Sequence, residues 1–220
     1  MYLLIKRLFD ILLPLLAIII LLPIFFIVIL ILSITGEGKV FYLQERFGYK
    51  NKTFNIIKFA TMLQNSPNIG TGLITLRNDS RLLPMGKFLR KTKINELPQI
   101  VNVIKGDMSI VGPRPLVDKT FNAYPENIRY KIYESKPGIT GIGSIIFRDE
   151  EYLLSNCKIP PQEYYEKVIA PYKGALEIWY NKHKSLFVDF TIVFLTGWII
   201  LFPKSNAAYK IFKDLPPKNF

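Results

Sequence analysis

The stretch KTKINELPQIVNVIKGDMSIVGPRP, residues 91–115, carries the most informative pattern of the chain. The spacing of its apolar residues predicts a helix over residues 80–105 with a break near Lys93. The expected apolar face of this helix is formed by Leu97, Ile100, Val101 and Ile104. Gly106 is expected to end the helix, and residues 107–117 to form a compact, turn-rich loop.

Two side chains at the start of this helix predict chemistry. If Asn95 is the N-cap, Pro98 falls at the third helical position, where its missing N–H leaves no bond unmade. Glu96 then lies at the positive end of the helix dipole, where helices also bind phosphate. A carboxylate beside lysines at such a helix start predicts a Mg²⁺–phosphate pocket, with Glu96 as the metal ligand. The alternative is a capped and solvated helix start.

The end of the stretch holds an arginine between two prolines, in Gly112-Pro113-Arg114-Pro115. Proline restricts the backbone on both sides of Arg114. The planar guanidinium of arginine matches the oxygens of a phosphate. By itself the motif could be only a turn, but its place after the helix favours a phosphate-binding role.

An uncharged, apolar run covers residues 11–36 and is long enough to span a bilayer. It is longer than the core of a signal peptide, so residues 1–36 are expected to be a retained membrane segment. Lys6 and Arg7 precede the run and basic residues follow it, so both flanks favour the cytoplasmic side. A re-entrant helix broken near Leu22-Pro23 satisfies both flanks. An ordinary kinked transmembrane helix is the alternative.

The remainder of the chain predicts a helix-rich α/β domain over residues 37–202 and a loose tail over residues 203–220. The expected elements are strands within 38–62 around a turn at 48–52, a mobile loop at 63–75, a helix at 118–133, a Gly-rich turn and a strand within 136–151, and a helix at 160–184. The domain is therefore expected to combine short strands with helices of differing length.

The segment at residues 187–202 is apolar but too short for a comfortable span. Trp179, Tyr180 and Trp198 lie near it in the sequence, as aromatic residues do at membrane surfaces. We therefore expect a helix at the membrane interface. The alternative is a core helix of the domain.

Composition limits the classes of function. The chain has 220 residues and a formal net charge of +12, which favours anionic partners such as nucleic acid, lipid or phosphorylated small molecules. No nucleic-acid-binding motif is present, so nucleic acid is not expected as a partner. The single cysteine, Cys157, allows no intrachain disulfide. The single histidine, His183, argues against a zinc site or a histidine-based triad.

Seven short motifs are distributed over nearly the whole chain. They are KRLFD (6–10), KFATM (58–62), DSR (79–81), GKFLR (86–90), ELPQ (96–99), VGPRP (111–115) and KPGITG (136–141). In order and spacing this set resembles the bacterial sugar transferases, the monotopic polyprenyl-phosphate phosphoglycosyl transferases, in a minimal-size form. The resemblance implies a small α/β domain on a re-entrant membrane helix, with amphipathic helices at the cytosolic face of the bacterial inner membrane.

The resemblance also implies an activity. The family transfers a sugar 1-phosphate from a UDP-sugar to polyprenyl (undecaprenyl) phosphate and releases UMP, as the initiating step of glycoconjugate or polysaccharide synthesis. Mg²⁺ assists, and an aspartate attacks the β-phosphate before the lipid phosphate takes the phosphosugar. The implied partners are the UDP-sugar, polyprenyl phosphate and membrane lipids; a homodimer and downstream glycosyltransferases are further possible partners.

The matched positions predict the site. Substrate binding is expected from Lys58, Arg90, Pro113, Arg114, Pro115 and Arg148. Asn95 stands where the family has its nucleophilic aspartate, and Glu96 is the adjacent carboxylate that helps to bind metal. Ala60 and Leu22 also replace the family's usual arginine and serine.

A neutral amide is a poor nucleophile, so Asn95 leaves the covalent step open. In one hypothesis the chain is active by another route, with Asp149 or Glu150 as nucleophile or with direct attack by the lipid phosphate. Acids on such a loop are more often simply solvated. In the alternative, the chain is a catalytically impaired member that binds nucleotide sugar or lipid as a scaffold.

Overall fold

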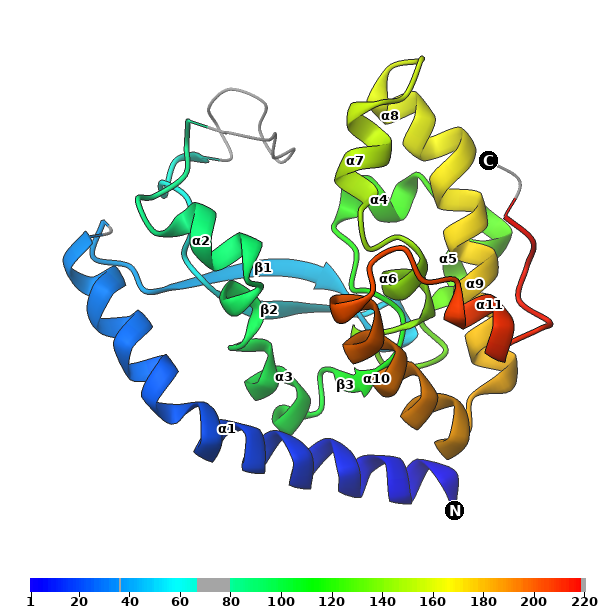
Figure 1. The fold of residues 1–220 in the computed structure, drawn as a ribbon, viewed down its shortest axis with the longest axis horizontal. Coiled ribbons are helices and arrows are strands. Elements are labelled where there is room, and N and C mark those ends of the chain that lie inside the picture. The colour runs from blue at the N-terminus through cyan, green and yellow to red at the C-terminus, as the bar shows by residue number, and fades with distance from the viewer. Residues whose placement is uncertain (36, 67–79, 219–220) are drawn as a thin grey trace. The chain divides into compact units, whose positions relative to one another are not determined.

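The computed structural model of the chain describes residues 1–35, 37–66 and 80–218. Helices dominate, with a few short strands, which confirms the helix-rich α/β class (Figure 1). The predicted loop at 63–75 lies outside the described residues from position 67 onward. The chain divides into a large unit, Met1–Asp10, Glu45–Phe54 and Lys105–Phe220, and a small unit, Ile11–Gln44 and Asn55–Ile104.

The elements follow one another in a simple order. The first part of the chain forms α1 (Tyr2–Thr35), β1 (Phe41–Phe47), the 3-10 turn η1 (Tyr49–Asn51), β2 (Thr53–Phe59), α2 (Gly86–Lys91), the 3-10 turn η3 (Ile94–Glu96), α3 (Gln99–Lys105) and β3 (Ser109–Val111). The second part forms α4 (Asp118–Asn122), α5 (Glu126–Ile132), β4 (Gly138–Thr140), α6 (Ile142–Ile146), α7 (Glu150–Ser155), α8 (Pro161–Tyr164), the π-helix η4 (Tyr165–Ile169), α9 (Ala170–His183), α10 (Leu186–Leu201) and α11 (Ala207–Ile211).

The helix α1 runs without interruption through Pro14 and Pro23. The predicted break near Leu22 is therefore wrong as a break in the secondary structure, because a helix can continue past the hydrogen bond that a proline removes. By length and composition α1 is able to cross a membrane. Its middle side chains, such as Ile19 and Phe26, are exposed, as expected for a helix that contacts lipid.

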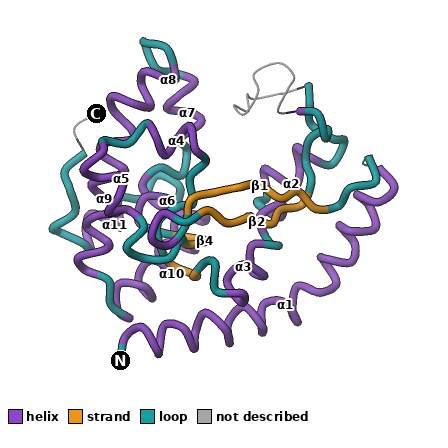
Figure 2. The backbone as a smooth tube through the Cα atoms, turned by 180° about the vertical axis from the view of Figure 1, so that it is seen from behind, coloured by secondary structure: helices purple, strands orange, loops and turns teal. Residues whose placement is uncertain are grey.

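The strands β1 and β2 form a two-stranded sheet, joined by the predicted turn after Gly48 (Figure 2). Lys50 and Asn51 adopt positive φ within this turn. In the small unit, Phe59 of β2 packs with Val28, Leu32 and Leu89. This cluster joins the end of α1, the strand and α2 into one core.

The predicted break near Lys93 is confirmed. Lys93 has a φ of 61°, which interrupts the helical path between α2 and η3. Gly106 follows α3 with a φ of 93°, so it ends the helix as predicted. The predicted apolar face is only partly right, because Val101 is exposed whereas Val103 is fully buried.

The core of the large unit surrounds α9. Ile169, Leu176 and Tyr180 pack there with residues of α5, α6 and α10 (Figure 1). Beside it, β3 and β4 pair in parallel, with Ser109 opposite Gly138.

Three expected elements differ in this unit. The predicted turn-rich loop at 107–117 contains the strand β3, and the Gly-rich segment contains β4. The short strand expected after the Gly-rich turn is not formed, because residues 142–146 form α6, whose packing against α9 overrides the preference of β-branched residues. The helix predicted over 118–133 is split into α4 and α5, since Pro125 carries no N–H to continue it.

The helix α10 matches the predicted segment at 187–202 and has one buried and one exposed side. Its Ile192 and Leu195 are fully buried in the core of the large unit. Its Phe187 and Phe194 are exposed, so the opposite side of the helix is apolar and uncovered. Trp179 and Tyr180 are buried in the core, so their predicted place near a membrane surface is wrong.

The tail is not loose over its described residues. Phe212 and Leu215 are buried in the core of the large unit, beside α11. The indole Nε1 of Trp179 donates a hydrogen bond to Asp214 Oδ2 at 2.8 Å. The tail thus covers one side of α9, and the expectation of a loose segment is wrong.

Candidate active site

The first candidate group lies in the small unit, where β2 and η3 carry opposite charges. Lys58 Nζ of β2 lies 4.0 Å from Glu96 Oε1, which ends η3. Both side chains are largely withdrawn from water, with exposed fractions of 15% and 18%. Two of the predicted site residues are thus brought together as a partly buried ion pair.

Asn95 precedes Glu96 in η3 and is buried. Its Oδ1 accepts no hydrogen bond within the described part of the chain, so the predicted N-cap is wrong. The reason is local: Asn95 lies inside η3, where the amide of Leu97 donates to the carbonyl of Ile94 at 3.1 Å, and Pro98 has no N–H to offer. Asn95 therefore leaves an unpaired, buried amide oxygen at the position where the sequence resemblance expects a nucleophile.

Asn102 fixes α3 to β2. Its Oδ1 accepts a hydrogen bond from Ile57 N at 3.0 Å, and its Nδ2 donates to Asn55 O at 2.8 Å. The side chain is fully buried and satisfies two backbone groups of the strand that continues into Lys58. Because Glu96 lies three residues before the start of α3, this clamp helps to set the spacing of the ion pair. Sequence reasoning missed this role, although a single asparagine among the apolar residues of a helix was the available signal.

Arg90, at the end of α2, lies in the same unit and contacts Thr61. Its Nε donates to Thr61 Oγ1 at 3.1 Å. A Cβ on Gly86 would lie 2.1 Å from Thr61 O, so only glycine allows α2 to come this close to residue 61. Ala60, at the family's usual arginine position, is buried beside it.

The second candidate group is the Gly112–Pro115 loop of the large unit. The hydroxyl of Tyr133 donates to Arg114 O at 2.9 Å and accepts from Leu116 N at 2.8 Å. Arg46 Nη1 donates to Pro115 O at 3.0 Å. Burial raises the pKa of Tyr133 well above its ordinary value, so its hydroxyl remains a donor. The loop is thus held by hydrogen bonds as well as by its prolines.

Three glycines allow this loop to lie against β4. A Cβ on Gly112 would lie 2.1 Å from Lys136 O. A Cβ on Gly138 would lie 2.1 Å from Gly112 N, and one on Gly141 2.1 Å from Gly112 O. Both prolines of the loop are buried, whereas Arg114 is only partly buried. The backbone packing therefore leaves the arginine side chain as the accessible part of the loop.

Arg148 and Asp149 follow α6 and are exposed. Glu150, which begins α7, forms an ion pair with the buried Lys173 of α9. A carboxylate in such a pair is a weaker nucleophile than a free one. Of the two acids considered as alternative nucleophiles, Asp149 is the more accessible.

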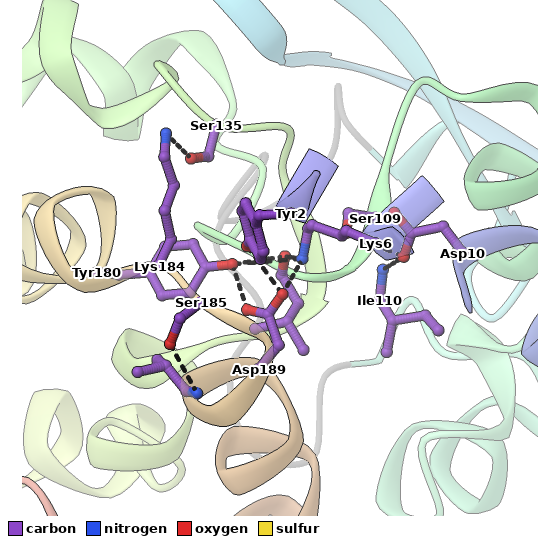
Figure 3. Close-up of polar contacts among 12 residues, drawn as sticks. Tyr2, Lys6, Asp10, Ser109, Ile110, Ser135, Tyr180, Lys184, Ser185 and Asp189 are labelled. Carbon is purple, nitrogen blue, oxygen red and sulfur yellow. Dashed lines mark hydrogen bonds and ion pairs between the residues drawn. The ribbon is translucent and has the colours of Figure 1, made fainter. Parts of the chain in front are cut away.

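The first turns of α1 are tied to the base of the same loop (Figure 3). Lys6 Nζ contacts Asp189 Oδ2 at 2.7 Å and Val111 O at 3.0 Å. Asp10 Oδ1 accepts from Ser109 Oγ at 3.0 Å and from Ile110 N at 2.9 Å. The KRLFD motif therefore holds β3, whose last residue directly precedes Gly112.

Comparison with known proteins identifies the family. The family model described as "Bacterial sugar transferase" matches residues 1–203. The chain belongs to this family. It is 34% identical over 210 residues to an uncharacterized sugar transferase of Haemophilus influenzae, a match that covers 89% of this chain and 41% of that protein.

Two further relatives show the range of the family. The exopolysaccharide production protein ExoY of Sinorhizobium fredii is 32% identical over 205 residues, covering 87% of this chain and 83% of ExoY. The undecaprenyl-phosphate galactose phosphotransferase of Salmonella typhimurium is 32% identical over 219 residues, covering 93% of this chain and 41% of that enzyme. The match thus spans well under half the length of the Haemophilus and Salmonella relatives.

The donor set is compatible with the Mg²⁺ that the bacterial sugar transferase family implies. Within residues 1–35, 37–66 and 80–218, no cluster of three histidine, cysteine or acidic side chains could enclose a metal ion. Mg²⁺ is commonly bound through one or two carboxylates together with substrate phosphates and water. Glu96 is such a single carboxylate, so its chemistry suits an ion that arrives with a diphosphate.

Proposed function

We propose that this chain transfers a sugar 1-phosphate from a UDP-sugar to polyprenyl (undecaprenyl) phosphate and releases UMP, as an initiating step of cell-surface polysaccharide or glycoconjugate synthesis. The observation that carries the proposal is the Lys58–Glu96 pair between β2 and η3, in a member of the bacterial sugar transferase family. The name of the Salmonella relative, an undecaprenyl-phosphate galactose phosphotransferase, supports the same substrate classes.

Each group of residues has a role in this proposal. Arg114 and Arg148 bind phosphate oxygens of the diphosphate, which arginine contacts in a bidentate manner. Lys58 and Arg90 add positive charge that offsets the dianionic substrates. Mg²⁺, held by Glu96, would neutralise charge on the diphosphate when it is bound.

The neutral Asn95 favours a route without a covalent intermediate at that position. In our proposal an oxygen of the lipid phosphate attacks the β-phosphorus of the UDP-sugar directly. A new P–O bond forms to the lipid, and the P–O bond to UMP breaks. Asp149 is the alternative nucleophile, because it is exposed and Glu150 is held by Lys173.

We place this reaction at the cytosolic face of the bacterial inner membrane. The long apolar α1 and the exposed apolar side of α10 support membrane association. The product, a polyprenyl diphosphate sugar, is the kind of acceptor that a downstream glycosyltransferase extends. The scaffold alternative is not favoured, because relatives of this chain are named as transferases.

The test is UMP release by the full chain in detergent, with a panel of UDP-sugars, undecaprenyl phosphate and Mg²⁺. Wild type is expected to release UMP only when lipid is present, and Asn95→Asp to show an additional burst without lipid. Glu96→Ala is expected to lose about 100-fold or more in kcat/KM, whereas the control Glu134→Ala, at an exposed site, is unaffected.

Three results would count against this reading. No UMP from wild type on any sugar, with release by Asn95→Asp, would contradict the proposed activity. Full activity in Glu96→Ala would contradict the site. Loss of activity in Asp149→Asn, together with a phosphosugar adduct at that residue in wild type, would replace direct attack by the covalent route.

A further inference from the structure

The helix α9 carries two buried charges one turn apart, Lys173 and Glu177. Charged side chains are almost never fully buried unless they are paired, and apolar residues would serve stability as well or better. A lysine and a glutamate at this spacing often pair with each other on an exposed helix. Here Lys173 pairs with Glu150 instead, which indicates that the two residues serve other segments of the large unit.

Lys173 holds the segment that carries Arg148. Its ammonium forms the ion pair with Glu150 and also lies 5.5 Å from the centre of the Phe147 ring. Phe147 is buried and makes an edge-to-face contact with Tyr172 of α9, the helix that carries Lys173. Since Phe147 and Glu150 flank Arg148, one buried side chain fixes the backbone on both sides of this arginine.

Glu177 lies against the loop that carries Arg114. Neither of its oxygens makes a hydrogen bond of ordinary geometry among the described residues, and the Arg114 amide lowers the pKa of its carboxyl against the larger effect of burial. A Cβ on Gly143 would lie 2.3 Å from Glu177 Oε1, so glycine at that position leaves the space for the carboxylate. The carboxylate is therefore fitted against Gly143 of α6, two residues after Gly141, whose backbone packs on Gly112 of the arginine loop.

We propose that Lys173 and Glu177 are positioning residues that hold Arg148 and Arg114 in one fixed arrangement for the diphosphate of the nucleotide sugar. All four residues belong to the large unit. The inference rests on the proposed function, which makes the two arginines substrate ligands. Two arginines whose backbones are fixed by one helix bind a diphosphate without the cost of ordering their loops on binding.

The test compares Glu177→Gln and Lys173→Met in the full chain in detergent. Both variants are expected to lose about 10- to 100-fold in kcat/KM for the UDP-sugar, because small displacements of substrate ligands have effects of this size. The KM for undecaprenyl phosphate is expected to stay within about twofold. UDP affinity, measured by titration calorimetry, is expected to fall in parallel, and Lys173→Arg to recover most of the loss.

Matched controls lie on the same continuous helical stretch. Lys167 and Glu163 form an exposed pair at 2.6 Å, so Lys167→Met and Glu163→Gln make the same charge changes without touching either arginine. These controls are expected to keep wild-type kinetics. Gly143→Ala is a second probe of the carboxylate, and it is expected to reproduce the loss of UDP affinity seen in Glu177→Gln.

The outcomes separate this inference from the proposed function. Unchanged UDP affinity and kcat/KM in Glu177→Gln and Lys173→Met would overturn the inference. So would an equal loss for both substrates, or a loss explained by the fraction of folded protein in a thermal melt. If wild type binds UDP but releases no UMP, the proposed activity fails, and the calorimetric comparison still decides the positioning role.

Discussion

The ammonium of Lys6 lies 2.7 Å from the carboxylate of Asp189 and thereby joins the first turns of α1 to α10 (Figure 3). The hydroxyls of Tyr2 and Tyr180 donate to the same carboxylate, at 2.9 and 2.7 Å. Burial and the charge of Asp189 raise the pKa of Tyr180 well above its ordinary value, so this hydroxyl stays a donor. A lysine that the sequence presents as a marker of membrane topology is thus also a packing residue.

Replacing Lys6 by methionine is expected to destabilise the protein by about 3 kcal/mol, because it leaves Asp189 buried without its cation. Chemical denaturation in detergent measures this loss. Lys213→Met, at an exposed site, is the control and should change stability by less than about 0.5 kcal/mol. The double variant Lys6→Met/Asp189→Leu should regain much of the loss. If it is as unstable as the sum of the single variants, the pair is not coupled.

Asn102→Leu tests the clamp between α3 and β2. The change leaves Ile57 N and Asn55 O without their partner, which should cost about 2 kcal/mol of stability. It should also lower kcat/KM, because the clamp spaces Lys58 from Glu96. Asn156→Leu replaces an exposed asparagine, just after α7, whose amide donates to Tyr152 O of that helix, and is the matched control. If the two variants have the same stability and the same kcat/KM, Asn102 does not act as a clamp.

Gly112→Ala tests the close packing of the arginine loop. The added Cβ would meet the backbone oxygen of Lys136, which cannot move without shifting β4, and should cost about 3 kcal/mol or more. Gly197→Ala on α10 is the control, because nothing lies within 4 Å of its added Cβ. That control should be neutral or stabilising by up to about 1 kcal/mol. Thermal melts of both variants make the comparison, and a harmless Gly112→Ala would contradict the packing.

Glu177 should make stability depend on pH. Burial raises its pKa to about 7, against the opposing effects of Lys173 and the Arg114 amide; Tyr124 and Tyr133 also face it. The folded state therefore binds more protons than the unfolded state between about pH 4.5 and pH 7. Stability from this group is thus present below that window and is lost as pH rises through it, on the order of 3 kcal/mol.

The measurement is the free energy of unfolding of wild type and Glu177→Gln at pH 5 and pH 8. The free energy of unfolding of the variant should decrease less than that of wild type between pH 5 and pH 8. The variant should therefore be more stable than wild type at pH 8, relative to pH 5, although it is less active. A purely structural glutamate would not give that combination. Identical pH dependence in both proteins would show that Glu177 does not titrate in this range.

Much of the fold could be predicted from local signals. The left-handed break at Lys93, the stop at Gly106 and the turn after Gly48 follow from residues that act on their own backbone. The split at Pro125 was also visible as a proline, although the prediction ran a helix through it. The helix α6 was not accessible in this way, because tertiary packing on α9 outweighs its β-branched residues.

The candidate site also contains some residues that the sequence predicts and others that only the fold reveals. Arg114, Arg148, Lys58 and Glu96 are given by motifs, and their catalytic or binding roles stay predictions. Lys173 and Glu177 could not be recognised, because in sequence they resemble an ordinary solvated pair on a helix. Their role depends on Glu150 and Gly143, which only the fold brings to them.

The tail sets a limit on truncation. The family match ends at residue 203, yet Phe212 and Leu215 still belong to the core around α9, and Asp214 accepts the hydrogen bond of the Trp179 indole. A shortened protein that stops at the family boundary would expose Trp179 to water and remove Asp214, the hydrogen-bond partner of its indole N–H. Because α9 also carries Lys173 and Glu177, such a deletion is expected to loosen the helix that positions Arg114 and Arg148. Trimming by sequence homology would thus remove part of the support of the phosphate ligands while leaving every motif intact.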